Sequence, residues 1–376
     1  MFKMQRVIVV GAGILGASTA YHLAKAEVEV TLVDRHDLGQ ATDAAAGIVC
    51  PWLSQRRNKA WYQLVKGGAR YYPSLIEQLS DVGETETGYK QVGAISLHTE
   101  LEKLEKMAER ARKRREEAPE IGEITILSQT ETKRLFPPLS EAYGSVYVSG
   151  GARVNGRALR QALVNAAVKY GASLLEGNAN LIHKNNQIMG VNLNNKILEA
   201  DLVIVTGGVW AKELLQPLNV EFLVKPQKAQ IVHLEIGNMD TSDWPVVMPP
   251  NDQYILSFED GRVVVGATHE DDAGLDLRVT AGGLNEVLGK ALLVAPGLAD
   301  SKILETRVGF RPFTPGFLPV IGSLPNYQGL LVSNGLGASG LTAGPYLGAE
   351  LAKLAQGREL ELNIGDYDVA GAIGVN

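Results

Sequence analysis

The chain has 376 residues, 45% of them hydrophobic and 21% charged, which is ordinary for a globular protein and long enough for two domains. Its net charge of −6 gives no reason to expect nucleic acid or an anionic membrane surface as a partner. The single cysteine, Cys50, excludes an internal disulfide and a cysteine-rich metal site, so no metal is expected. No apolar run approaches the about 18 residues of a transmembrane segment, and we expect a cytoplasmic protein.

The stretch from Val7 to Asp34 has the order strand, glycine turn, helix, strand. Gly11 allows a tight turn, Gly13 lets the backbone approach a pyrophosphate, and Gly16 lets helix and strand lie close together. The start of the helix presents free N–H groups and a positive dipole end to phosphates, and Asp34 can accept from ribose hydroxyls. The pattern predicts a dinucleotide-binding βαβ unit. The alternative, a glycine-rich turn of an α/β protein, leaves Asp34 unexplained.

Small residues from Ala41 to Val49 follow. They indicate either a chain that passes close to a flat, bulky group or the start of an alanine-rich helix. Residues 61–79 predict a helix with a kink or break at Pro73.

The sequence changes character after residue 80. Residues 89–98 predict a strand, and 101–117 predict a charged helix with Leu101, Leu104, Met107 and Ala111 on its apolar face. Interleaved Glu residues favour a solvated face over a nucleic-acid-binding patch. Short strands are predicted at 124–127 and 144–148.

Features of a nucleotide-binding domain return in a predicted helix at 155–170 and a predicted strand at 200–206, which is fully apolar from Leu202 to Val205. This strand ends in a second glycine turn, Gly207-Gly208-Val209-Trp210, at the sheet edge where ligands bind in open α/β folds. Residues 223–266 are strand-rich, with a tight hairpin at Asp260-Gly261, and 284–293 predict a helix. The chain closes with residues 309–322, a strand at 330–333, a glycine-rich segment at 334–342 and a helix to Ala355.

We therefore predict an α/β protein in which a Rossmann-type FAD/NAD(P)-binding domain carries a second domain made from two insertions. The cofactor domain would comprise residues 1–80, 145–220 and 305–376. The second, substrate-binding domain would comprise 81–144 and 221–304 and would be α+β with a mainly antiparallel sheet.

These motifs in this order resemble the D-amino-acid oxidase superfamily of flavoproteins, in the branch with glycine oxidase, sarcosine oxidase and D-amino-acid dehydrogenase. The resemblance covers nearly the whole chain and is carried by GAGILG with Asp34, ATDAAAGI, TGGVW, GFRPFTPGFLPVIG and GLGASGLT. It implies an FAD-dependent amine oxidoreductase that oxidises a small amino acid or N-substituted glycine to an imino acid by hydride transfer to flavin N5. Oxygen or another acceptor would take the electrons, and oligomerisation is possible.

The glycine-rich loop from Gly335 to Thr342 opens a helix whose N–H groups could face the flavin N1/C2=O edge, which gains negative charge on reduction. Covalent-flavin relatives carry a cysteine near Gly309, and this chain has none there, so we expect non-covalent FAD. The residues expected to bind the cofactor are Gly11, Ala12, Gly13, Ile14, Leu15, Gly16, Asp34, Arg35, Thr42, Ala45, Ala46, Gly47, Asn180, Thr206, Gly207, Gly208, Trp210, Gly337, Gly340, Leu341 and Thr342.

The resemblance assigns the substrate carboxylate to Arg311, because its guanidinium offers two parallel N–H donors that match a carboxylate. The alternative is a structural arginine paired with an internal acid, and Arg307 is the competing candidate. Tyr254 resembles a family tyrosine that hydrogen-bonds the same carboxylate, although a lone tyrosine on a strand is also compatible with a place in the core.

The chain departs from the family pattern at several positions. Gly316 stands where an acid often follows, and the strand 262–266 lacks the lysine that sarcosine oxidases place over the flavin, which puts fast reaction with oxygen in doubt. Trp52, Arg56 and Arg57 could line the active site or form a surface turn, and His269 is interpreted as a surface residue.

Two other functions stay open. One is oxidation of a 2-hydroxy acid, and the other is electron transfer by a flavoprotein that lacks its own small substrate. The substrate and its chirality are not specified by the sequence.

Overall fold

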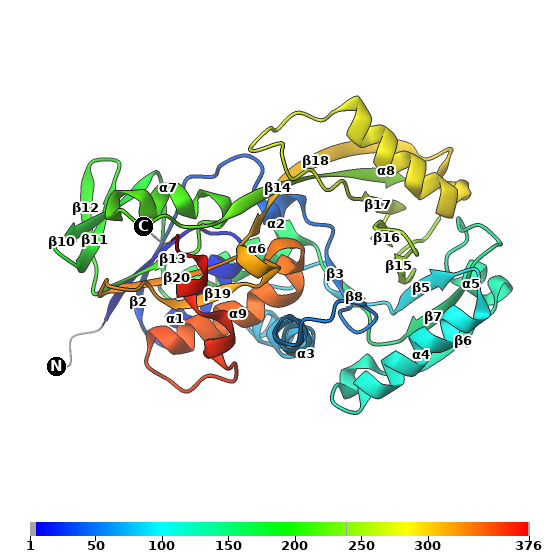
Figure 1. The fold of residues 1–376 in the computed structure, drawn as a ribbon, viewed down its shortest axis with the longest axis horizontal. Coiled ribbons are helices and arrows are strands. Elements are labelled where there is room, and N and C mark those ends of the chain that lie inside the picture. The colour runs from blue at the N-terminus through cyan, green and yellow to red at the C-terminus, as the bar shows by residue number, and fades with distance from the viewer. Residues whose placement is uncertain (1–4, 238, 375–376) are drawn as a thin grey trace.

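A six-stranded sheet and an eight-stranded sheet lie side by side in the computed structural model, which describes residues 5–237 and 239–374 (Figure 1). The six-stranded sheet has the order β19-β20-β13-β1-β2-β9, and its strands are parallel except for the edge strand β19. The strand bounds are β1 Arg6–Val10, β2 Glu29–Asp34, β9 Ser173–Glu176, β13 Leu202–Val205, β19 Val320–Ser323 and β20 Leu330–Asn334.

Both faces of this sheet are buried, which explains its unbroken apolar strands. In β1, Val7 and Val9 face the layer of long helices, whereas Ile8 faces the opposite layer. The helices are α1 (Ile14–Lys25), α3 (Lys59–Asp81), α6 (Gly156–Lys169) and α9 (Gly340–Ala355). The opposite layer is α7 (Ala211–Leu215) with a small antiparallel sheet of β10 (Ala179–Lys184), β11 (Gln187–Leu193) and β12 (Lys196–Glu199). The predicted Rossmann-type α/β fold is confirmed.

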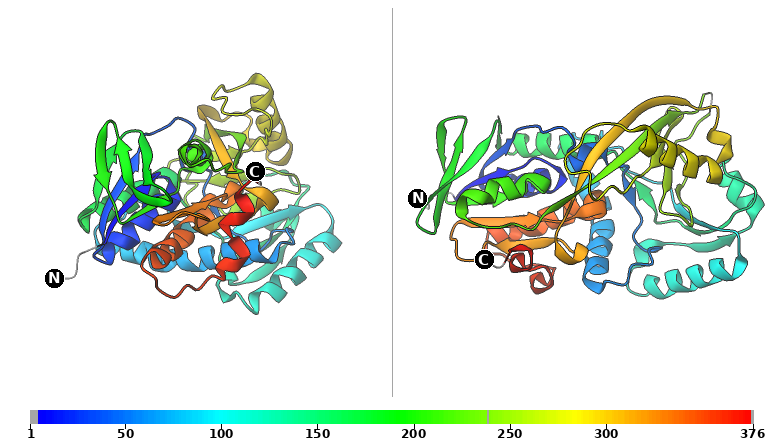
Figure 2. Two further views of the ribbon diagram at one scale, coloured as in Figure 1. Left: turned by 60° about the vertical axis from the view of Figure 1, so that its left-hand side comes forward. Right: turned by 45° about the horizontal axis from the view of Figure 1, so that its top comes forward.

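The eight-stranded sheet is antiparallel except for one parallel pair, β15 with β5. Its order is β18-β14-β17-β16-β15-β5-β7-β6, and α8 (Ala281–Val294) lies against β14 and β17 (Figure 2). Helices α4 (Leu101–Arg115) and α5 (Gln129–Leu135) cover β6 and β7. The bounds are β5 Ala94–His98, β6 Ile124–Leu127, β7 Gly144–Val148, β14 Lys225–Glu235, β15 Val246–Met248, β16 Tyr254–Ser257, β17 Arg262–Gly266 and β18 Lys302–Phe313. A third, small sheet joins β3 (Ile48–Val49), β8 (Ala152–Arg153) and β4 (Lys90–Gln91).

The strands do not divide at the predicted domain boundaries. Both β7 and β18 belong to the eight-stranded sheet, although residues 145–220 and 305–376 were expected in the cofactor domain. The physical reason is strand pairing: β18 pairs along its length with β14 and continues that sheet to its edge. The division into two domains therefore stays a proposal, and residues 1–4 and 375–376 of the expected cofactor domain lie outside the described part.

Helix α3 continues through Pro73 without the break that the sequence offered as one of two possibilities, and the proline ring lies on the exposed face of the helix. A second helix also differs from expectation. Leu101 does not join the buried face of α4 with Leu104, Met107 and Ala111, since it opens the helix and is 61% exposed. Within residues 5–237 and 239–374, no helix is long and apolar enough to cross a membrane.

Candidate active site

A cavity of about 820 Å³ runs from the first glycine turn to strands of the eight-stranded sheet. At one end lie Gly11, Gly13 and Asp34, where β1 and β2 end. At the other end lie Tyr254 on β16 and Arg311 on β18. The cavity therefore connects the carboxyl edge of the parallel sheet with the second sheet, which is where an open α/β fold binds its ligand.

The first turn needs glycine at two positions. Gly11 has φ +106°, and a Cβ on Gly16 would lie 1.8 Å from the Gly11 carbonyl oxygen, so α1 can approach β1 only without that atom. Asp34 fixes the same turn, because its Oδ2 accepts from the Ala12 amide at 2.5 Å and its Oδ1 from the His36 amide at 2.6 Å. Ala12 and Gly16 thus shape the turn and do not line the cavity.

The small-residue segment, residues 41–49, contains both predicted features: a short helix, and a stretch of chain that passes along the cavity. Ala41–Ala44 form a short helix, α2, and the chain then runs extended along the cavity past Gly47. Gly47 has φ +103°, and a Cβ there would meet the Val154 carbonyl oxygen at 1.8 Å. Thr42 Oγ1 accepts from the Ile14 amide at 3.0 Å and so connects this segment to the start of α1.

The second and third glycine turns meet at the same cavity. Asn334 Nδ2 donates to the Gly208 carbonyl at 2.8 Å and joins them. Helix α9 begins at Gly340 without a side-chain cap, and a Cβ on Gly340 would enter open space. Ser333 Oγ is buried without a partner in the described part of the chain. Two helix starts whose own N-cap residues provide no side-chain cap, and an orphaned hydroxyl, lie beside a long cavity, and they fit a dinucleotide with polar groups along its length.

All the other residues expected to bind the cofactor line this cavity, as do both substrate candidates. They are Gly11, Gly13, Ile14, Leu15, Asp34, Arg35, Thr42, Ala45, Ala46, Gly47, Asn180, Thr206, Gly207, Gly208, Trp210, Gly337, Gly340, Leu341 and Thr342, with Tyr254 and Arg311. Arg35 lies at the wall with its guanidinium already paired to Asp37 and Glu213.

Arg311 is half-buried and forms no ion pair with the described residues. Its Nη1 donates to Gln227 Oε1 at 2.9 Å, and it interacts with the hydroxyl of Tyr254. Burial raises the pKa of Tyr254, and the positive charge of Arg311 partly opposes this rise. The alternative that Arg311 neutralises an internal acid therefore finds no acidic partner among residues 5–237 and 239–374.

Arg307, the competing candidate, has partners in the protein. Its Nη2 donates to Glu305 at 2.6 Å and its Nη1 to the Asp43 carbonyl at 3.2 Å. It is absent from the residues that line the cavity. The strand 262–266 is likewise turned away, with Val263, Val264 and Val265 buried in the core.

Four residues had no assigned place in the site, and the structure gives each of them a different location. Trp52 is buried in the core, and Arg57 is exposed and lines neither cavity of this region. Arg56 lines a second, smaller cavity. His269 is exposed, as expected, yet it also lines both cavities. Loss of hydration and the nearby charge of Arg311 lower the pKa of His269, which keeps its imidazole neutral at pH 7.

Gln227 is the site residue that sequence reasoning missed. It lies opposite Arg311 in the antiparallel pair of β14 and β18, and its Nε2 donates to Asp271 Oδ1 at 2.8 Å. Only the register of the two strands brings it to Arg311, and no local motif records that register. The only signal in the sequence was a glutamine within the strand-rich region 223–266, and its burial became apparent only in the structure.

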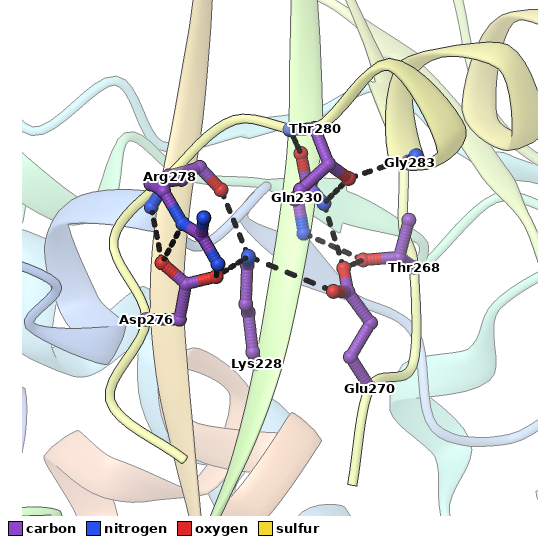
Figure 3. A network of polar contacts seen from close by, with 8 residues as sticks. All are labelled: Lys228, Gln230, Thr268, Glu270, Asp276, Arg278, Thr280 and Gly283. Carbon is purple, nitrogen blue, oxygen red and sulfur yellow. Dashed lines mark hydrogen bonds and ion pairs between the residues drawn. The ribbon is translucent and has the colours of Figure 1, made fainter. Parts of the chain in front are cut away.

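The side chains of β14 alternate between the two faces of the strand. Gln227 contacts Arg311, and Ala229 and Ile231 line the large cavity. Lys228 and Gln230 point to the opposite side and hold the segment 268–280 against the strand (Figure 3). Lys228 is fully buried, and its Nζ donates to the Arg278 carbonyl at 2.8 Å and pairs with Asp276 at 3.2 Å. This segment carries His269 and Asp271 to the site.

Comparison with known proteins agrees with this geometry. Residues 6–354 match the DAO family, described as FAD dependent oxidoreductase. The chain belongs to this family. FAD is therefore its cofactor, and the glycine turns, Asp34 and the long cavity are where the DAO fold would hold it.

Members of the DAO family resemble the chain over almost its full length. A Bacillus subtilis (strain 168) protein named uncharacterized oxidoreductase YurR is 66% identical over 98% of this chain and 100% of its own. The crystal structure of iminodiacetate oxidase from Chelativorans sp. BNC1 superposes with a TM-score of 0.94 at 45% identity, covering 96% of this chain and 98% of that one. Glycine oxidase from Geobacillus kaustophilus superposes with a TM-score of 0.84 at 26% identity, covering 97% and 99%.

Proposed function

We propose that the protein is an amine oxidoreductase of the glycine oxidase and iminodiacetate oxidase type that oxidises an N-substituted glycine or a small amino acid. The observation that carries this proposal is Arg311: a half-buried guanidinium with a neutral hydrogen-bond partner and no acidic partner in the described part of the chain, beside Tyr254, in the cavity proposed to hold the cofactor. The names of the solved relatives support an amine as the reacting group.

In this proposal, the protein residues position the substrate. Arg311 takes the substrate carboxylate through two N–H donors, and the Tyr254 hydroxyl adds a third contact. These contacts fix the α-carbon, and the neutral nitrogen beside it supplies a lone pair as the C–H bond breaks. FAD supplies the oxidation when bound, by accepting the hydride. No protein base is required, and water hydrolyses the imino product.

The flavin is proposed to be non-covalent, since the single cysteine, Cys50, directly follows the small-residue segment, away from Gly309 in the sequence, and burial raises the pKa of its thiol to about 12. Release of yellow flavin into the supernatant after acid precipitation would show this. Flavin retained in the protein pellet would contradict it.

The substrate is identified by mixing the anaerobic holoenzyme with glycine, N-methylglycine, D-amino acids and proline and following the visible flavin band. The proposal predicts bleaching by at least one of these amines, and admission of air then distinguishes oxygen from another acceptor. Bleaching by lactate-type acids alone would favour a hydroxy-acid oxidoreductase. A flavin that stays oxidised with every small compound and is reduced by a protein partner would indicate electron transfer.

A further inference from the structure

A second cavity, of about 380 Å³, adjoins the large one, and the two share Arg311, His269 and Ala338 as wall residues. Its wall includes two arginines, Arg56 and Arg311, and no carboxylate among the described residues. Two arginines in the wall of one small space, without a carboxylate beside them, create a positive potential there. Such a space favours an anionic ligand.

Arg56 is held in place by neutral groups. Its guanidinium lies over the Trp61 ring, with 4.7 Å from Cζ to the ring centroid, and Nη2 donates to the Phe317 carbonyl. Trp61 is itself fixed, because its Nε1 donates to Ser339 Oγ at 2.9 Å. Loss of hydration lowers the pKa of Arg56, yet a guanidinium stays charged at neutral pH.

Arg35, Arg153 and Arg262 each pair with a carboxylate, whereas Arg56 forms no ion pair with the described residues. Arg114 is also stacked on an aromatic ring without an acidic partner in the described part of the chain, but it lines neither cavity, so Arg56 differs from it in facing a space that a ligand can enter. Stacking on an indole fixes the plane of the guanidinium and leaves N–H donors on its edge. Arg56 is therefore a cation held in a fixed orientation. It has lost part of its hydration and has gained no acidic partner among the described residues.

We infer that Arg56 and the second cavity bind a second carboxylate, carried by the N-substituent of a secondary amine whose reacting carboxylate is held by Arg311. The inference rests on the proposed function and adds the substrate class: glycine derivatives with an anionic group on nitrogen. For iminodiacetate, one N–CH₂ carbon loses a hydride to FAD and the nitrogen loses a proton. One water then hydrolyses the C=N bond to give glyoxylate and glycine.

The test compares iminodiacetate with its mono-amide, N-(carbamoylmethyl)glycine, which has nearly the same shape and lacks the second charge. For the wild-type holoenzyme, we expect the second-order rate of anaerobic flavin reduction to be about tenfold or more higher with iminodiacetate. Equal rates with the two compounds would overturn the inference and leave the proposed function standing.

Two variants then test whether Arg56 causes the preference for iminodiacetate over its mono-amide. In Arg56→Gln the ratio between the two substrates should fall toward one, whereas in Arg57→Gln, the matched change at the exposed neighbour, it should persist. A ratio that survives in Arg56→Gln would overturn the assignment. Retained flavin absorbance and an unchanged thermal midpoint show that each variant is folded, and the wild-type comparison decides the matter without any variant.

A binding measurement needs no turnover. Oxydiacetate and methoxyacetate lack the reacting nitrogen and differ by one carboxylate, and each can be titrated against the visible spectrum of bound FAD. We expect oxydiacetate to bind about tenfold more tightly in the wild type. Equal affinity would contradict the inference even if no amine reduced the flavin, so its failure can be distinguished from failure of the proposed function.

Discussion

Arg311 and Gln227 face one another across the antiparallel pair of β18 and β14, and Arg311 Nη1 lies 2.9 Å from Gln227 Oε1. The glutamine amide is in turn fixed by Asp271, on the segment that Lys228 holds against β14. Because its partner is an amide and not a carboxylate, Arg311 is oriented without being neutralised. A fixed orientation and a charge without an acidic partner are the two properties that an arginine needs before it binds a carboxylate.

Gln227→Glu should weaken substrate binding, because it sets a carboxylate between Arg311 and Asp271, which now accepts from the Gln227 amide at 2.8 Å. The new carboxylate would pair with Arg311 and compete with the substrate, so we expect KM for a carboxylate-bearing amine to rise about tenfold or more, with a smaller change in kcat. Steady-state kinetics measure this. Gln78→Glu on α3 adds the same charge away from both cavities and serves as the control. An unaltered KM in Gln227→Glu would show that Arg311 does not bind the substrate.

Lys228→Met should destabilise the fold. The change leaves Asp276 and Glu270 without the buried ammonium that now lies 3.2 and 3.6 Å from them, and it frees the Arg278 carbonyl. Breaking such a buried network costs about 3 kcal/mol of unfolding free energy. Chemical denaturation measures the loss, and Lys212→Met, at an exposed position, is the control. Equal denaturation midpoints for Lys228→Met and the wild type would contradict this account of the network.

His233 should make the protein less stable in mild acid. Burial, with Arg307 and Arg262 nearby, lowers its pKa to about 3, while an unfolded histidine titrates near about 6.5. Between these values the unfolded state binds the extra proton, so stability is lost as the pH falls from about 6.5 toward about 3.

The comparison is made with His233→Gln, which should reduce the slope of unfolding free energy against pH by up to about 1 kcal/mol per pH unit in that window. His183→Gln, at an exposed histidine, is the matched control and should keep the wild-type slope. If His233→Gln keeps the same slope as the wild type, His233 does not remain neutral in the folded protein.

The sequence predicted the parts of the site that local geometry dictates. Gly11 and Gly16 could be recognised because a βαβ turn has no room for a Cβ at those positions, and Asp34 because it ends the second strand. Gln227 and Arg56 reach the site through strand register and loop packing between segments far apart in the chain, which no local pattern encodes. The same limit explains why the predicted boundaries at residues 145 and 305 cut through β7 and β18, which both belong to the eight-stranded sheet.

The most direct measurement is anaerobic flavin reduction by N-methylglycine in the wild type and in Arg311→Met. We predict that the wild type bleaches with saturable kinetics. Arg311→Met should keep its FAD, yet its apparent second-order rate should fall about a hundredfold or more, because the carboxylate loses its charged partner. Acetate, a carboxylate without an amine, should compete in the wild type and not in the variant. Equal reduction rates and equal inhibition by acetate in the two proteins would contradict the central claim that Arg311 binds the substrate carboxylate.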